Sequence, residues 1–106
     1  MKVLFDQGTP APLRSALAGH EVKTAFECGR ETLENGVLLA AAEADGFDVF
    51  VTTDRNLRYQ QNLSQRRIAI VILGTTNWPR MRPHAGLVAK ALNGVAPGAF
   101  IEVSIP

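Results

Sequence analysis

The stretch that most constrains the fold is residues 47–56, FDVFVTTDRN. Val49, Phe50 and Val51 form a short β-prone apolar run, with Gly46 before it and polar residues after it. An apolar run without alternation is typical of a parallel strand that is covered on both faces. Its polar residues follow the carboxyl end of the strand, where open α/β sheets bind their ligands. The stretch therefore predicts both a parallel sheet and the edge at which to look for a site.

Four further strands are expected, because short β-prone segments recur along the chain. They cover residues 2–6, 21–25, 68–73 and 99–105. Strands that alternate with helices imply an α/β fold, here a three-layer α/β/α sandwich with a mainly parallel sheet of about five strands. The length of the chain is that of one domain, residues 1–106.

The order of the strands follows from the handedness of their connections. Right-handed crossovers favour an arrangement with the second strand on one side of the first, and the third, fourth and fifth on the other. The order then reverses between the first and third strands. The switch point of the sheet, where ligands bind, therefore falls at Asp6 and Asp54.

Three helices are expected between the strands. The first begins at Pro10 with Thr9 as its N-cap, and the last begins at Pro83 and turns Leu87 toward the sheet with Val88, Ala91 and Leu92. The remaining segments are predicted as a helix over residues 35–45, a short helix or turn over residues 56–62, and a polar loop over residues 74–82.

Charge is distributed unevenly along the chain, although the formal net charge is only +1. Residues 1–54 hold nine acids and four bases, and residues 55–106 hold one acid and seven bases. Halves of opposite sign favour an acidic or metal site beside an anion-binding surface. The alternative is that the two halves simply complement each other.

Features of membrane or secreted proteins are absent from the sequence. No apolar run approaches the ~18 residues of a membrane helix, and the apolar start is too short for a signal peptide. Cys28 is the single cysteine, so it cannot form an internal disulfide. We expect a cytoplasmic protein without membrane contact.

Two carboxylates, those of Asp6 and Asp54, are expected side by side at the switch point. They repel each other unless a cation lies between them, and Mg²⁺ or Mn²⁺ accepts such a pair with waters completing its octahedron. Glu27 and Glu34 are expected at the same edge, and Glu43, Asp45 and Asp48 at the opposite one. The alternative is that Asp6 and Asp54 only cap turns or pair with Arg55.

Four segments resemble the short bacterial PIN-like domains: residues 3–6 (VLFD), 19–22 (GHEV), 38–43 (LLAAAE) and 51–57 (VTTDRNL). The resemblance covers roughly residues 2–75. It implies a compact α/β/α sandwich in which clustered acids bind Mg²⁺ or Mn²⁺. Its better-known members are ribonucleases, often the toxins of toxin–antitoxin pairs, so the implied partners are single-stranded RNA, an antitoxin protein and a second copy of the chain.

The resemblance assigns roles to individual residues. Asp6 matches the acid of the first strand and Asp54 the acid after the third, and both would bind the metal with help from Asn35 or Glu34. Gln7, Asn35 and Asn56 stand where many relatives have acids. The resemblance therefore leaves two functions open, an active metal-dependent endoribonuclease and a binding module that has lost its chemistry.

Substrate contacts are expected from the residues around Asp54. Arg55 and Arg58 are candidates for phosphate binding, and Thr52, Thr53 and Asn56 are candidates for hydrogen bonds to water or phosphate. Trp78, which precedes Arg80, Arg82 and His84, either stacks on a base or folds back as a lid over the sheet edge.

A receiver-like phosphoacceptor domain is a further alternative. Asp54 stands where such domains carry the phosphorylated aspartate, and Asp6 where they carry a metal ligand. Gln7 breaks their usual acidic pair, and residues 100–103 lack the lysine that would bind the phosphate.

Overall fold

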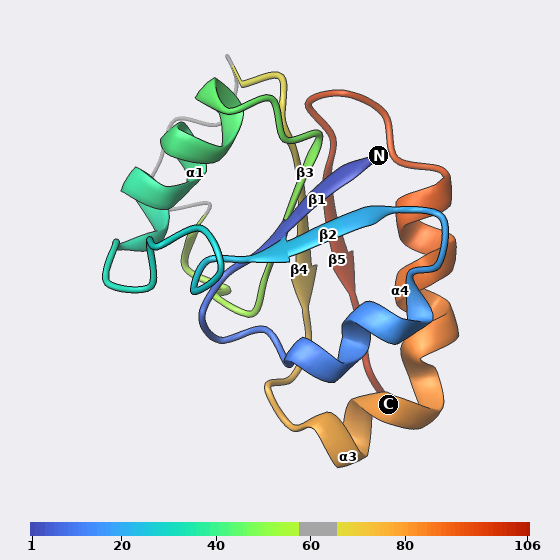
Figure 1. Cartoon of the computed structure of the whole chain (residues 1–106). Helices are drawn as coiled ribbons and strands as arrows, with labels where there is room; N and C mark the ends of the chain where they lie inside the picture. The colour runs from blue at the N-terminus through green and yellow to red at the C-terminus, as the bar shows by residue number, and fades with distance from the viewer. Residues whose placement is uncertain (58–65) are drawn as a thin grey trace.

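The computed structural model describes residues 1–57 and 66–106 (Figure 1). Five strands form one sheet in the order β2-β1-β3-β4-β5, and every neighbouring pair is parallel. This order confirms the predicted arrangement, with the switch point between β1 and β3. The strands are β1 (Lys2–Phe5), β2 (Glu21–Thr24), β3 (Val49–Thr52), β4 (Ala69–Leu73) and β5 (Phe100–Val103).

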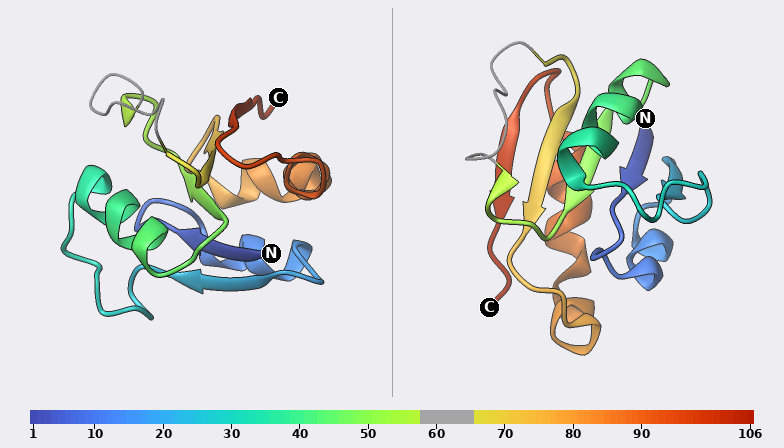
Figure 2. Two further views of the ribbon diagram at one scale, coloured as in Figure 1. Left: turned by 90° about the horizontal axis from the view of Figure 1, so that it is seen from above. Right: turned by 90° about the vertical axis from the view of Figure 1, so that its left-hand side faces the viewer.

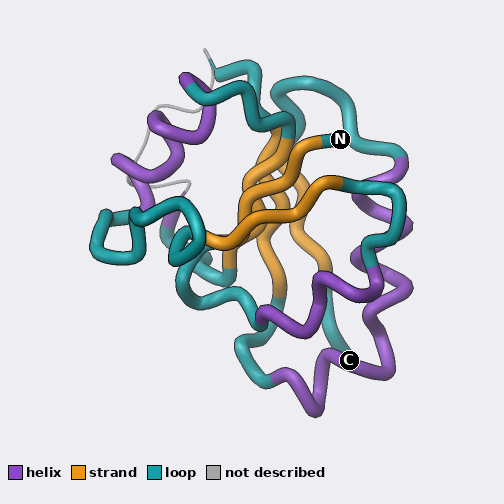
Figure 3. Tube along the Cα trace, in the orientation of Figure 1, coloured by secondary structure: helices purple, strands orange, loops and turns teal. Residues whose placement is uncertain are grey.

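Helices cover both faces of the sheet, as predicted (Figures 2 and 3). One face carries α1 (Asn35–Ala44). The other carries a 3-10 helix, η1 (Ala11–Ala16), and the helical segment that runs through α3 (Trp78–Met81), η2 (Arg82–His84) and α4 (Ala85–Asn93). None of the helices in the described ranges is long and apolar enough to cross a membrane.

Strand side chains alternate between two separate cores. Val3, Phe5 and Val51 belong to the core under η1 and α4, and Leu4 and Phe50 belong to the core under α1. All of them are fully buried, which explains why β3 reads as a continuous apolar run. By the same alternation, Asp6 and Thr52 fall on the α1 side of the sheet.

The end of α1 fixes the direction in which the helix crosses the sheet. Gly46, at φ +82, donates its N–H to the carbonyl of Glu43, and Phe47 donates to that of Ala42, which is a Schellman motif. The chain then turns directly into β3. Because α1 ends at the amino edge of the sheet, its first residue, Asn35, lies at the carboxyl edge.

The predicted first helix is a 3-10 helix, and its predicted cap is wrong. The N-cap position is occupied by Pro10, and no side chain caps it. The Thr9 hydroxyl instead lies 2.6 Å from Oδ1 of Asp6 and 3.1 Å from the carbonyl oxygen of Val51. The Thr9 hydroxyl therefore faces the end of β1 at the sheet edge and does not cap η1.

The segment after β4 also differs from its prediction as a polar loop. It contains α3, whose N-cap Asn77 accepts a hydrogen bond from the backbone N–H of Arg80. In α4, Val88 and Leu92 are buried, whereas Leu87 is 44% exposed, so the expected inward position of Leu87 is wrong. Most of the short helix or turn predicted over residues 56–62 lies outside the described residues.

The acids expected at the opposite edge are found there. Asp48 Oδ2 accepts a hydrogen bond from the N–H of Lys2 at the start of β1, and Glu43 Oε2 accepts from the N–H groups of Arg67 and Ile68. Asp45, after α1, forms an ion pair with Arg30. Asp48 and Glu43 thus connect elements at the amino edge, and Asp45 connects the end of α1 to the turn after β2. None of these three acids shares a site with Asp6.

Candidate functional site at the carboxyl edge

Asp6 is the buried centre of the carboxyl edge, with only 4% of its surface exposed. Its backbone N–H donates to the carbonyl of Val51, so the pairing of β1 with β3 continues to this residue. Its Oδ1 accepts from the hydroxyl of Thr9 at 2.6 Å, and its Oδ2 from the hydroxyl of Thr52 at 2.5 Å. Burial of a charged carboxylate is costly unless it is hydrogen-bonded, and these hydroxyls supply the bonds.

Thr52, the last residue of β3, connects the two acidic positions. Its hydroxyl accepts a hydrogen bond from the backbone N–H of Asp54 at 3.0 Å and donates its single proton to Asp6. Thr52 is fully buried. Thr52 therefore positions the acids. Its hydroxyl already donates one hydrogen bond and accepts another, so it has little capacity left for the substrate contact expected from the sequence.

Asn35 bridges the two carboxylates. Its Nδ2 lies 3.2 Å from Oδ2 of Asp6 and 3.2 Å from Oδ2 of Asp54, so each amide hydrogen serves one acid. The two carboxylate oxygens are thus no farther apart than twice that distance. The structure brings the three predicted site residues together, with the positive end of an amide dipole between two acids.

The two oxygens of Asp54 have different surroundings. Oδ1 accepts a hydrogen bond from the N–H of Asn56 at 3.0 Å, the arrangement by which aspartates commonly cap a turn. Oδ2 faces Asn35 and Asp6. The turn-capping alternative and the paired-acid hypothesis therefore describe different oxygens of one side chain. Among the described residues, Arg55 forms no ion pair with Asp54, because its guanidinium donates to the carbonyl of Gly74 at 2.6 Å.

The residues at this edge offer oxygen ligands of the kind that a hard divalent cation accepts. Asp6 and Asp54 supply carboxylates, and Asn35 can supply its amide oxygen if the amide turns over. Within the described ranges, no three acidic, histidine or cysteine side chains come together. Glu34 is exposed and lies in the wall of a groove beside Asp54, so its role as a further ligand stays a prediction.

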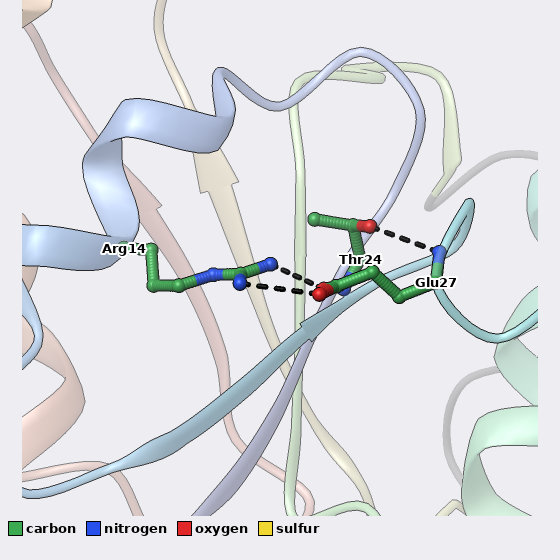
Figure 4. A network of polar contacts seen from close by, with 3 residues as sticks. All are labelled: Arg14, Thr24 and Glu27. Carbon is green, nitrogen blue, oxygen red and sulfur yellow. Dashed lines mark hydrogen bonds and ion pairs between the residues drawn. The ribbon is translucent and has the colours of Figure 1, made fainter.

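Glu27 follows the carboxyl end of β2, but its carboxylate is occupied by Arg14 (Figure 4). Thr24 donates its backbone N–H to Oε1 of Glu27, and its hydroxyl accepts from the N–H of Glu27. The hydrogen bonds from Arg14 and then from Thr24 lower the pKa of Glu27 to about 2. Glu27 therefore anchors the turn after β2 to η1.

The described residues line three hollows that open at the carboxyl edge, and the second of them extends along α1. The first, of about 460 Å³, is next to Asp6, the second, of about 950 Å³, is next to Asp54, and the third, of about 340 Å³, is beside β4 and β5. Arg66 lines the second hollow with Asp54 and Glu34, and Arg55 and Arg80 line the third with Glu102. Arg66 precedes β4 at the amino edge and shares the second hollow with Asp54 only because that hollow runs along α1, past Ala40. Its position in the sequence therefore gives no signal of this contact.

The remaining predicted contacts are distributed around this edge. Thr53 packs closely on Gly8, where an added Cβ would lie 2.7 Å from the Thr53 hydroxyl. Asn56 is exposed, and Arg58 lies outside the described residues. Trp78 is half-buried and packs against the core under α4, which favours the lid alternative over free base stacking. Arg80 and Arg82 are exposed.

Comparisons of this chain with protein families, with curated proteins and with solved structures find no match. The geometry of the carboxyl edge is therefore the basis on which a function can be assigned. The strongest element of that geometry is the contact of one amide with two acids from β1 and the end of β3.

Proposed function

We propose that the protein is a metal-dependent endoribonuclease of PIN-like type that cuts single-stranded RNA in the cytoplasm. The observation that carries the proposal is the convergence of Asp6 and Asp54 on one nitrogen of Asn35 at the switch point of the sheet. Open α/β sheets bind ligands at this place. Two carboxylates that each lie 3.2 Å from one shared donor form a pair that attracts a cation. The resemblance to PIN-like ribonucleases supplies the reaction class.

Asp6 and Asp54 would hold Mg²⁺ or Mn²⁺, with the Asn35 amide oxygen or Glu34 as an additional ligand. Such an ion supplies a Lewis acid that lowers the pKa of water and offsets charge on the attacked phosphate. The chain itself keeps the ligands in place. The hydroxyls of Thr9 and Thr52 hold the carboxylate of Asp6, and the N–H of Asn56 orients that of Asp54.

The phosphate backbone would be bound by the arginines beside the acids. Arg66 shares a groove with Asp54, and Arg55 shares the neighbouring cavity with Arg80. Arg58, predicted for the same role, lies outside the described residues. Thr53 and Asn56, close to Asp54 in the sequence, would donate hydrogen bonds to phosphate oxygens. In this proposal the protein is a toxin whose antitoxin partner covers the same edge.

A second candidate function is an RNA-binding module that keeps the fold without the chemistry. It is favoured by Asn35, whose amide already satisfies the acid pair without any ion. Gln7 and Asn56 further reduce the number of acids at the site. RNA binding with no cleavage at any metal concentration is what distinguishes this candidate from the nuclease.

The deciding experiment is cleavage of an end-labelled single-stranded RNA in Mn²⁺ and in EDTA. We expect cleavage only with Mn²⁺. Asp54→Asn should abolish cleavage while RNA binding persists or tightens, since a negative charge near the phosphate is removed. Asp48→Asn, an acid at the opposite edge, is the matched control and should cut at the wild-type rate. A wild-type protein that binds RNA without cutting it would establish the binding module, and one that does neither would exclude both.

Metal binding can be measured separately from cleavage. Mn²⁺ at millimolar concentration should raise the melting temperature of the wild type, because a ligand of the folded state stabilises it by mass action. Asp6→Asn should remove this shift. An unchanged wild-type melting curve would contradict the metal site whatever the outcome with RNA.

A further inference from the structure

Phe26 is the most exposed large apolar side chain of the described residues, with 68% of its surface accessible. Leu87 and Val37, also exposed, reach 44% and 56%. Single apolar side chains are common on protein surfaces, so exposure alone assigns no role to Phe26. Its role follows from the turn that holds it and from the hollow beside it.

The turn after β2 holds Phe26 firmly by its backbone. Ala25, on the inner side, is buried and donates its N–H to the carbonyl of Phe5, and Gly29 donates to the carbonyl of Phe26 itself. Thr24 and Glu27 exchange hydrogen bonds across the turn, and Arg14 ties Glu27 to η1 (Figure 4). The ring is therefore presented on an ordered turn, which reduces the entropy cost of binding a ligand on it.

The hollow beside Phe26 measures about 460 Å³ and reaches the main candidate site. Its polar lining consists of hydroxyl and amide side chains and one carboxylate: Gln7, Thr9, Thr24, Thr76 and Asp6. The carboxylate of Asp6 is 4% exposed, with both oxygens hydrogen-bonded. No lysine, arginine or histidine is found among the described residues that line it. These lining residues offer a phosphate no positive charge.

A hollow with an aromatic wall and neutral hydrogen-bonding groups matches a nucleobase. Bases stack on aromatic rings, and their edges carry both donors and acceptors. The Gln7 side chain is exposed and offers both an amide N–H and an amide oxygen. The lining therefore complements a planar, uncharged ligand and disfavours an anion.

We propose that Phe26 and this hollow bind one base of single-stranded RNA, with the base stacked on the ring and its edge read by Gln7 and Thr76. The inference rests on the proposed function, because the same strand must reach Asp54. Thr76 lies two residues beyond Gly74, which lines the cavity of Arg55 and Arg80. The base site and the cationic site are thus neighbours on one edge, as a strand with a charged backbone and neutral bases requires.

The test uses adenosine 5′-monophosphate in EDTA, so that it needs neither metal nor cleavage. We expect upfield shifts of the Phe26 ring protons on titration, because a stacked base shields them. Phe26→Ala should weaken binding about tenfold or more, the effect of losing one base–aromatic stack. Phe26→Trp should keep or tighten binding. The control is Leu87→Ala, an exposed apolar residue on α4, which should bind as the wild type does.

The outcomes separate this inference from the nuclease proposal. Ring shifts and tenfold weaker binding by Phe26→Ala, in a protein that never cuts RNA, would support the base site and exclude the nuclease. Cleavage by Phe26→Ala with an unchanged KM, together with unaltered nucleotide affinity, would exclude the base site alone. A loss of self-association in Phe26→Ala without any effect on nucleotide binding would assign the ring to a protein contact and overturn the inference.

Discussion

Asp6 and Asp54 accept hydrogen bonds from the same atom, Nδ2 of Asn35, at 3.2 Å each. The acids come from the ends of β1 and β3, and the amide from the first residue of α1. An amide offers only a partial positive charge, yet it relieves the repulsion of two carboxylates without an ion. Metal binding must therefore compete with a hydrogen-bonded arrangement that is already satisfied, and this competition can be altered at Asn35.

Asn35→Asp should make the site more dependent on metal. A third carboxylate replaces the bridging donor, so we expect the free energy of unfolding in EDTA to fall by about 1–3 kcal/mol. The melting-temperature shift caused by Mn²⁺ should exceed that of the wild type, because three acids attract the cation. Thermal unfolding with and without Mn²⁺ measures both. Asn35→Ala is the control, since it loses the bridge without gaining charge; an equal Mn²⁺ shift in both variants would contradict the proposed ligand set.

Thr52→Val should destabilise the fold although the two side chains have nearly the same shape. The change removes the donor to Asp6 and the acceptor for the N–H of Asp54, both in a fully buried position. We expect a loss of about 1–3 kcal/mol in urea unfolding. Thr53→Val, at a half-buried residue whose hydroxyl has no hydrogen bond to the described part of the chain, should stay within about 0.5 kcal/mol. Equal effects of the two changes would show that the Thr52 hydroxyl is not needed by the acids.

Glu27→Gln should change the pH dependence of the stability of the fold. The pKa of Glu27 is lowered from 4.5 to about 2 in the folded protein, chiefly by Arg14. A lowered pKa stabilises the fold fully above pH 4.5, and that contribution disappears as the pH falls from 4.5 toward 2. Melting temperatures should therefore be lower for Glu27→Gln at pH 7 and converge with the wild type near pH 2. Curves that stay parallel across this range would refute the Arg14–Glu27 contribution.

Two glycine substitutions should have effects of opposite sign. A Cβ on Gly74 would lie 3.2 Å from the backbone nitrogen of Ile105 and 3.3 Å from the carbonyl oxygen of Val103, so Gly74→Ala should push β5 away and cost about 1–3 kcal/mol. Gly86, in α4, has open space around that position, so Gly86→Ala should stabilise by up to about 1 kcal/mol. Urea unfolding of both variants tests this pair of predictions. If Gly74→Ala left the free energy of unfolding unchanged, the backbone of Val103 and Ile105 would be able to move away from residue 74 at no cost.

The sheet could be predicted from the sequence because each strand repeats one local signal. Val49, Phe50 and Val51 indicate burial on both faces, and the rule of right-handed crossovers then limits the order of the strands. The position of Leu87 could not be predicted in this way. Val88 and Leu92 share its helix, and only packing against the sheet and η1 selects which apolar residues are covered.

The candidate site could be predicted as far as its acids, and not in its donors. Asp6 and Asp54 end predicted strands, so topology alone places them together. Thr9 was expected to cap a helix, because a threonine before Pro10 carries that local signal. Its hydroxyl instead faces Asp6 and the carbonyl oxygen of Val51, and Val51 is distant in the sequence, so the local cap signal could not show this position. The ion pair of Arg14 with Glu27 likewise joins two different elements, so no spacing rule identifies it.

The hydrogen bond from the Asp6 N–H to the carbonyl of Val51 places the candidate carboxylate on two interior strands, β1 and β3. Edge strands fray more easily than central ones, and an amide between two central strands exchanges its hydrogen mainly when the whole domain opens. Deuterium should therefore enter the Asp6 amide at the rate of global unfolding, and the β2 amides sooner. Local fraying at either end of the sheet then leaves the spacing of the two acids unchanged.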